Sequence, residues 1–144
     1  MAFSSRWRNA TRAIAANPSQ KERYASGNYV SLNVGPRRFA IYEHLRPGSV
    51  RVRPGQRVKS GDIIGALGFT GDSTGPHLHL PVAECATPFA CEGVPFTIRR
   101  MIVNGRYADV GDMGLRPWGT VTGRQRPGAF WPGYNVVVSF PGTR

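Results

Sequence analysis

Apolar and polar residues alternate cleanly over residues 29–34, where every second side chain is a large aliphatic one. This period of two is typical of a β-strand with one buried face. Residues 35–38, Gly-Pro-Arg-Arg, form a turn sequence, and residues 39–44 alternate again. The two segments together predict a β-hairpin. On the second strand His44 shares a face with Tyr42, so it can point toward a site on that face.

Another alternating segment, residues 73–80, holds two of the three histidines in the chain, in the order Ser-Thr-Gly-Pro-His-Leu-His-Leu. Strand geometry places His77 and His79 on one face, roughly 7 Å apart along the backbone. Two imidazoles side by side suit a metal ligand beside a proton-transfer group. Taken alone, the pair is more readily explained as two half-exposed histidines hydrogen-bonded to backbone carbonyls.

Glycine and proline punctuate the rest of the chain, with 18 and 12 residues respectively. Over residues 50–65 short apolar pairs are separated by glycines, which suits tight corners in a strongly curved β structure. Residues 97–103 and 136–140 each predict one further strand. We therefore expect an all-β fold, a small, mainly antiparallel sheet or barrel-sandwich followed by an irregular Gly/Pro-rich extension. The expected parts are a basic N-terminal tail, a β domain and the extension, over residues 1–26, 27–104 and 105–144.

The chain carries a formal net charge of +11, from 17 arginines and 2 lysines against 8 acidic residues. Such a charge attracts polyanions, including nucleic acid, anionic lipid and acidic cell-wall polymers. The arginines are spread along the chain without a recognition helix, an aromatic RNA-binding signature or a dense basic block, which argues against nucleic acid. No apolar run approaches the roughly 20 residues of a membrane span. Residues 1–20 lack the apolar centre of an export signal.

Cys85 and Cys91 are the only cysteines, six positions apart. A bridge between them would close a small loop, stabilise the fold by about 2 kcal/mol and imply an oxidising compartment. Two buried thiols or an additional metal site are the alternatives, although the spacing matches no standard zinc pair. The sequence leaves the disulfide and the free thiols equally open.

Four segments, in order and spacing, resemble the lysostaphin-like zinc metallopeptidases, which cut peptide bridges in bacterial cell walls. They are Gly-Asn-Tyr-Val, Tyr-Glu-His-Leu, Pro-Gly-Gln-Arg-Val-Lys-Ser-Gly and Gly-Asp-Ser-Thr-Gly-Pro-His-Leu-His, at residues 27–30, 42–45, 54–61 and 71–79. The resemblance covers about residues 27–96. Because of this resemblance, we interpret His77 and His79 as site residues and not as two half-exposed histidines bonded to backbone carbonyls. The resemblance also implies a largely antiparallel β fold with a groove across one sheet.

By the family's pattern His79 is a zinc ligand, while His44 and His77 orient the zinc-activated water and stabilise the developing oxyanion. Such chemistry is coherent, because zinc lowers the pKa of its water toward 7 and a nearby imidazole can exchange a proton. Asn28 and Tyr42 match positions near the groove. The resemblance thus implies a zinc-dependent metalloendopeptidase that cleaves peptidoglycan cross-links, in the cell envelope or outside the cell.

The sequence departs from the family at the other zinc ligands. A catalytic zinc needs three protein ligands and an open position, and the family takes two of them from an upstream His-x-x-x-Asp segment. The 27 residues before Asn28 contain neither histidine nor aspartate. Glu43, Asp72 and Cys85 could donate in principle, but none occupies a ligand position of the family. We therefore expect only one of the three zinc ligands, His79, and a truncated or impaired enzyme.

Three explanations fit this departure: an N-terminally truncated hydrolase, a degenerate relative that binds without cutting, or ligands supplied by another polypeptide. Truncation is favoured because the downstream motifs are intact. The main alternative function is a non-catalytic envelope module that binds peptidoglycan or acidic wall polymers through its basic surface. A biotinyl or lipoyl carrier would modify Lys59, which lacks the flanking methionines of such carriers.

Overall fold

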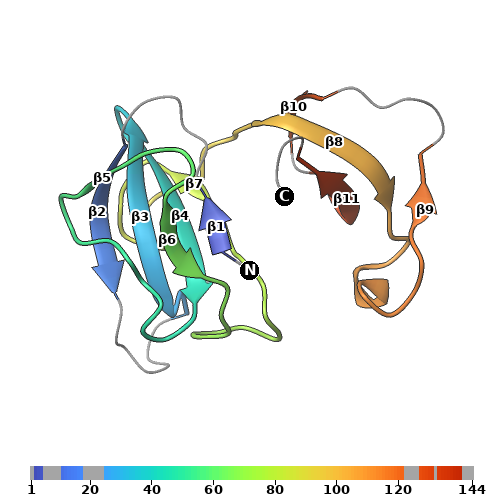
Figure 1. Cartoon of the computed structure of the whole chain (residues 1–144), viewed down its shortest axis with the longest axis horizontal. Helices are drawn as coiled ribbons and strands as arrows, with labels where there is room; N and C mark the ends of the chain where they lie inside the picture. Colours follow the sequence, from blue (N-terminus) through green and yellow to red (C-terminus); the bar gives the residue numbers. More distant parts are fainter. Residues whose placement is uncertain (1, 5–10, 18–24, 122–126, 132, 141–144) are drawn as a thin grey trace. The chain divides into compact units, whose positions relative to one another are not determined.

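The computed structural model describes residues 2–4, 11–17, 25–121, 127–131 and 133–140 (Figure 1). Over these residues every pair of strands is antiparallel, and the helical structure is limited to the short 3-10 turn η1 (Val110–Asp112). The all-β, antiparallel expectation is confirmed. Within the described part of the chain, no helix is long and apolar enough to cross a membrane. The chain divides into two compact units, Met1–Pro95 and Phe96–Arg144.

The first unit is built on an open five-stranded sheet with β5 and β7 at its edges. Its strands, in spatial order, are β5 (Arg57–Val58), β2 (Thr11–Asn17), β3 (Asn28–Gly35), β4 (Arg38–Leu45) and β7 (Val82–Ala83). A second, two-stranded sheet pairs β1 (Ala2–Ser4) with β6 (Ile63–Ala66). The short strands agree with the frequent glycines in the sequence, because each glycine-containing turn ends a strand after a few residues. Strand β2 lies inside the segment expected to be a tail, residues 1–26.

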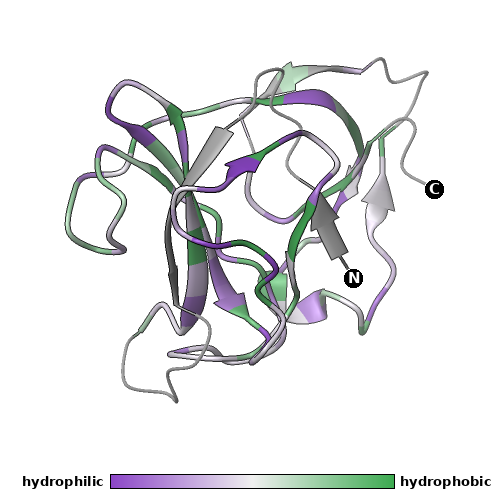
Figure 2. Ribbon diagram, turned by 60° about the vertical axis from the view of Figure 1, so that its left-hand side comes forward, coloured by the Kyte–Doolittle hydropathy of each residue, from purple (hydrophilic) through white to green (hydrophobic). Residues whose placement is uncertain are grey.

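The predicted hairpin is present as β3 and β4, which pair from Gly35 opposite Arg38 down to Asn28 opposite Leu45. Hydrophobic and hydrophilic residues alternate along the central strands (Figure 2). The core contains the side chains of Val30, Leu32, Ile41, Leu45, Val58 and Ile64, each about 1% exposed or less. Burying one such aliphatic side chain stabilises a fold by about 1.5–3 kcal/mol. This core fixes the position of the last residues of β4, which carry His44.

The second unit is a four-stranded sheet centred on β8 (Ile98–Arg106). Strands β9 (Gly119–Thr120), β10 (Gly128–Phe130) and β11 (Val136–Ser139) each pair with β8. The strands predicted at residues 97–103 and 136–140 are therefore confirmed, and the expected irregular extension contains three short strands. Ring contacts join residues that flank the strands, Tyr107 with Trp118 at a centroid distance of 6.0 Å and Phe96 with Trp131 at 5.9 Å.

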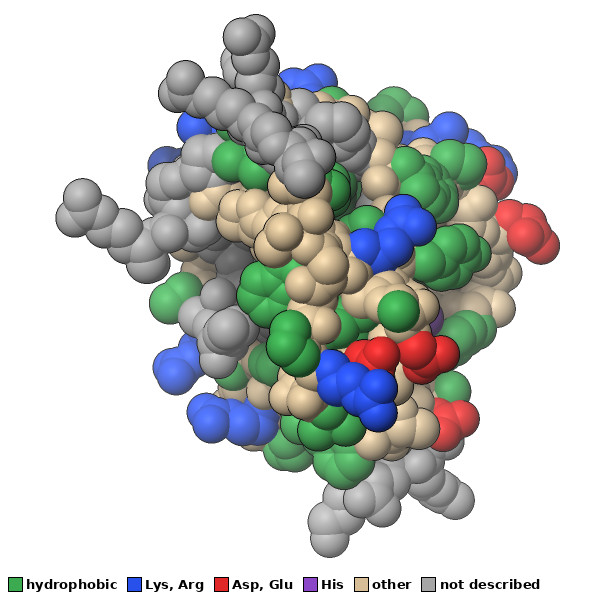
Figure 3. Space-filling model, turned by 90° about the vertical axis from the view of Figure 1, so that its right-hand side faces the viewer, with side chains coloured by type: hydrophobic (Ala, Val, Ile, Leu, Met, Phe, Trp, Pro, Cys, Tyr) green, Lys and Arg blue, Asp and Glu red, His purple; other side chains and the backbone are tan. Residues whose placement is uncertain are grey.

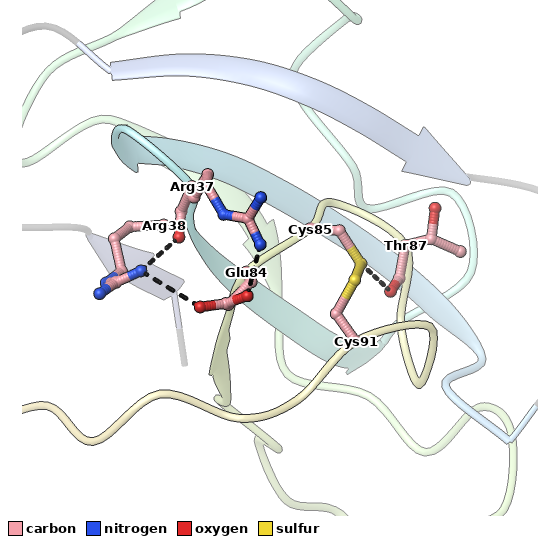
Figure 4. Close-up of a disulfide and its surroundings, with 6 residues drawn as sticks. All are labelled: Arg37, Arg38, Glu84, Cys85, Thr87 and Cys91. Atoms are coloured by element: carbon pink, nitrogen blue, oxygen red, sulfur yellow. Dashed lines mark hydrogen bonds and ion pairs between the residues drawn. A yellow bond between two sulfur atoms is a disulfide. The ribbon is translucent and has the colours of Figure 1, made fainter.

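Cys85 and Cys91 form a disulfide, and their Cα atoms are 5.8 Å apart (Figure 4). This resolves the alternatives that the spacing left open, because neither thiol is free to hold a metal. Next to the bridge, Arg37 in the β3–β4 turn donates to the Glu84 carboxylate over 2.7 Å. The ion pair is exposed and therefore adds little stability by itself. The disulfide closes a loop within the segment after β7, and the ion pair connects the start of that segment to the hairpin turn.

Candidate active site

A β-bulge near the end of β4 brings Glu43 and His44 to the same site. Along β3 the register advances by two residues, from Asn28 to Val30, while β4 advances by three, from Leu45 to Tyr42. The extra residue is accommodated at His44, whose φ of 59° lies in the left-handed region. A bulge of this kind breaks the strict alternation of side chains. As a result, two consecutive residues each contribute a donor atom to one group.

His44 is buried, 3% exposed, and its ring is oriented by the backbone. Its Nδ1 atom lies 2.8 Å from the carbonyl oxygen of Thr70. A carbonyl oxygen only accepts, so Nδ1 carries the proton and Nε2 keeps its lone pair. The lone pair of Nε2 can then bind a cation or accept a proton.

The loop around Thr70 reaches this position because glycines line its contact with the strand ends. Gly27 and Gly71 both have positive φ, and the backbones of the two residues pack directly on one another. A Cβ atom at either position would collide with backbone atoms of the other segment. Asp72 continues the contact through its N–H, which donates to the Ala25 carbonyl over 3.0 Å. These close contacts place the Thr70 carbonyl oxygen next to the His44 ring.

His77 and His79 face His44, as the alternation in their segment predicts. The ring centroids of His44 and His77 are 4.6 Å apart, and those of His44 and His79 are 5.9 Å apart. Backbone pairing sets these positions, with His79 opposite Glu43 and His77 opposite Gly68. All three histidines expected at the site therefore lie together.

The His77 imidazole is oriented in the same way as that of His44. Its Nδ1–H donates to the Gly75 carbonyl oxygen over 2.8 Å, and Ser73 Oγ lies 3.1 Å from the same nitrogen. Nε2 again keeps its lone pair. Because the His77 side chain is exposed, this lone pair can meet a substrate or a water molecule.

His79 and Glu43 both favour their neutral forms in this site. The His79 side chain is 47% exposed, and burial of its remainder, followed by the nearby His44 and His77, lowers its pKa. The Glu43 side chain is 1% exposed, and burial raises its pKa to about 7. The two groups approach within 3.6 Å, between Nδ1 and Oε2. This separation is too long for a hydrogen bond.

One donor atom from each of Glu43, His44 and His79 lies within 4.8 Å of the others, a separation small enough for a shared metal ion. The expectation that only one of three zinc ligands is present is therefore not supported by the structure. Asp72 is exposed and outside this group, and Cys85 is in the disulfide. Sequence reasoning named Glu43 as a donor in principle, but nothing in the alternation pattern signals the bulge that directs it to the site.

Residues 12–90, more than half of the chain, match the sequence model of peptidase family M23. The chain belongs to peptidase family M23. This M23 chain is 46% identical over 54 residues to the peptidoglycan DD-endopeptidase ShyC of Vibrio cholerae, an alignment that covers 38% of the chain and 12% of ShyC. It is 50% identical over 58 residues to the glycyl-glycine endopeptidase ALE-1 of Staphylococcus capitis, covering 39% of the chain and 15% of ALE-1.

The backbone is also similar to the catalytic domain of the prophage-encoded M23 protein EnpA from Enterococcus faecalis. The TM-score is 0.52, with 24% sequence identity and 65% of each chain covered. At this identity the similarity describes the fold. The sequence alignments cover only 12% of ShyC and 15% of ALE-1. The activity of this M23 chain therefore has to be argued from its own site.

Proposed function

We propose that the chain is a zinc-dependent endopeptidase that hydrolyses peptide cross-links of peptidoglycan. The observation that carries this proposal is the convergence of His44, His77 and His79, two of which present an Nε2 lone pair fixed by a backbone carbonyl. Membership of family M23 supports it. So do the names of two relatives, one a peptidoglycan DD-endopeptidase and the other a glycyl-glycine endopeptidase.

The residues present fit a zinc ion. Histidine nitrogen and carboxylate oxygen are both common zinc ligands, and the buried Glu43 Oε2 has no hydrogen-bond partner among the described residues. We propose His79 as a metal ligand, as the family resemblance implies. When bound, zinc would lower the pKa of a water molecule toward 7 and polarise the scissile carbonyl.

His77 supplies proton transfer. His77 Nε2 accepts a proton from the attacking water, whose oxygen forms the new bond to the carbonyl carbon. The same imidazolium then donates its proton to the amine as the C–N bond breaks, so the products are one carboxylic acid and one amine. Gly75 holds the ring in the tautomer that this step needs, through the 2.8 Å hydrogen bond to Nδ1. His44, whose ring centroid lies 4.6 Å from that of His77, presents the lone pair of its Nε2 to the same site.

The test is digestion of purified sacculi by the full chain, measured as release of soluble fragments and of new amino groups. Sacculi with direct D-amino acid cross-links and sacculi with glycine bridges should both be used, because the two relatives are named for different bonds. We expect release with zinc, loss with chelator, recovery on adding zinc back, and loss in His79→Ala. Intact sacculi of both kinds in the presence of zinc would contradict the proposal.

A second candidate function is a non-catalytic module that binds peptidoglycan or an acidic wall polymer. The net charge of +11 favours it, as do exposed apolar side chains in the second unit such as Leu115, 83% exposed, and Tyr134, 90% exposed. Figure 3 shows hydrophobic side chains at the surface, together with basic and a smaller number of acidic ones. Binding to sacculi that persists in chelator and weakens steeply with salt would favour this function. Either function places the protein in the cell envelope or outside the cell, which suits the Cys85–Cys91 disulfide.

A further inference from the structure

The carboxylate of Glu43 is buried without a partner for one of its oxygens. The side chain is 1% exposed, and Oε2 accepts no hydrogen bond from any described residue. Burying an ionised carboxylate without a partner costs several kcal/mol or more. A buried polar atom without a partner calls for an explanation, and an ion bound at the site is one. His79 Nδ1 lies 3.6 Å from Oε2, too far to donate a hydrogen bond to it.

We infer that Glu43 is a metal ligand, and that Glu43, His44 and His79 form the three-ligand cation site of this chain. The inference rests on the proposed function, because it identifies the donors of the metal used there. It assigns a role to a residue for which the family resemblance has none. The set is one carboxylate and two imidazoles, which suits zinc or a similar borderline divalent cation.

The distances support a shared cation. In a tetrahedral zinc site with bonds near 2.05 Å, neighbouring ligand atoms are about 3.3 Å apart. The separation of 3.6 Å between Glu43 Oε2 and His79 Nδ1 is close to this value and too long for a hydrogen bond between the two groups. The other donor pairs lie within 4.8 Å.

The bulge explains how adjacent residues can serve one ion. In a regular strand Glu43 and His44 would lie on opposite faces of the sheet. The positive φ of His44 and the register shift against β3 remove this separation. Because β-bulges re-aim side chains and are often found beside active sites, the bulge is a specific device for this ligand set.

His44 is the third ligand in this site, and its Nε2 is prepared for it. The carbonyl of Thr70 accepts the Nδ1 proton, as backbone carbonyls commonly do for metal-bound histidines. His77 is then left for proton transfer, with its own Nε2 free. Three protein ligands leave one position of a tetrahedral site open, as a catalytic zinc requires.

The test is zinc affinity, measured by equilibrium dialysis of the purified full chain, for the wild type and for Glu43→Gln. Glutamine keeps the size of the side chain and removes the charge. Loss of a direct ligand should lower affinity on the order of 100-fold or more, since loss of outer partners alone costs 10–100-fold. His44→Gln and His79→Gln should lower it similarly. Glu92→Gln, the same change at an exposed position, is the matched control and should leave affinity unchanged.

Cobalt provides a second readout that does not depend on activity. We expect Co²⁺ bound to the wild type to give the intense visible absorption of a four-coordinate site, and Glu43→Gln to lose it or change its spectrum. Circular dichroism of the metal-free proteins checks that each variant is folded. A folded Glu43→Gln with wild-type zinc affinity and an unchanged cobalt spectrum would overturn the inference, as would a wild type that takes up no zinc.

The two proposals fail differently. If Glu43→Gln binds zinc as the wild type does while the wild type still digests sacculi, the ligand assignment is wrong and the peptidase function stands. If zinc binding depends on Glu43 but the loaded protein digests no sacculi, the ligand assignment stands and the function is wrong. A variant that keeps zinc and loses only hydrolysis would make Glu43 a proton-transfer group, and this too overturns the inference.

Discussion

The Nδ1–H of His44 donates to the carbonyl oxygen of Thr70 over 2.8 Å, and this contact links the histidine cluster to a loop 26 residues downstream. The Thr70 side chain holds the loop in place. Its Oγ1 accepts from the Asn28 N–H and donates to the Leu45 carbonyl, each over 2.9 Å. One residue therefore joins the ends of two strands through its hydroxyl and orients an active-site ring through its backbone.

Replacing Thr70 by valine tests this linkage. The substitution keeps the shape of the side chain but leaves the buried Asn28 N–H without its hydroxyl acceptor, while the Leu45 carbonyl keeps only the longer hydrogen bond from Asn28 Nδ2, over 3.3 Å. We expect the free energy of unfolding to fall by about 1–3 kcal/mol, the range for unsatisfied buried groups. Urea unfolding measures it. Thr74→Val, at an exposed position, is the control and should have little effect. Equal stabilities of the two variants would contradict the role given to Thr70.

The buried carboxyl of Glu43 predicts a specific pH dependence for the metal-free protein. Burial raises its pKa from 4.5 to about 7, so between these values the folded protein holds more protons than the unfolded chain. Stability should therefore fall as pH rises through this window, by up to about 3 kcal/mol. The lowered pKa of His79 acts in the opposite direction below pH 6.5. The difference between wild type and Glu43→Gln isolates the glutamate contribution.

The measurement is chemical unfolding of both proteins in chelator from pH 4.5 to 8. The free energy of unfolding of the wild type, relative to that of the variant, should be highest at pH 4.5 and should fall as the pH rises. Parallel pH profiles would show that the Glu43 carboxyl titrates normally and is not held in a low-dielectric site.

His77→Gln should separate hydrolysis from metal binding. His77 lies outside the group of three donors, so we expect zinc affinity to stay within a few-fold of the wild type. Loss of a proton-transfer group should lower kcat about 10²–10⁴-fold. Ser73→Ala removes only the hydroxyl next to His77 Nδ1 and should have a much smaller effect, because the Gly75 carbonyl still orients the ring. A large loss of zinc in His77→Gln would place His77 among the ligands.

The disulfide should contribute to stability without contributing to the site. Closing a loop over a sequence separation of 6 residues stabilises a fold by about 2 kcal/mol in the chain-entropy description. The double variant Cys85→Ser, Cys91→Ser should lower the free energy of unfolding by about this amount and leave zinc affinity unchanged. Thermal unfolding with and without reductant provides the comparison, since reductant should affect only the wild type. A double variant that loses zinc would contradict this separation of roles.

The sequence correctly predicts the strands that carry the site and the side to which its histidines point. Alternation locates β3 and β4 to within one residue at each end, because both strands bury a regular row of apolar side chains. The same period places His77 and His79 on one side, and the structure brings both to His44. Periodicity succeeds here because burial on a sheet face is a local property of the chain.

Features that depend on pairing between distant segments cannot be predicted from the sequence pattern. The bulge at Glu43 and His44 arises from the register of β4 against β3, and a hydrophobic pattern that simply continues does not indicate it. The disulfide depends on a 5.8 Å approach of two Cα atoms, which spacing alone leaves open. For the first of these reasons the sequence names Glu43 only as a donor in principle, since the side of the sheet to which its side chain points depends on the register.

Mass spectrometry of a purified cross-linked muropeptide dimer tests the central claim most directly. The protein is stripped with chelator, incubated with the dimer, and then supplied with zinc. We predict no change before zinc and, after it, conversion to two fragments whose masses sum to that of the dimer plus one water. A dimer that stays whole in the zinc-loaded protein, whichever type of cross-link it carries, would contradict a histidine cluster built for hydrolysis.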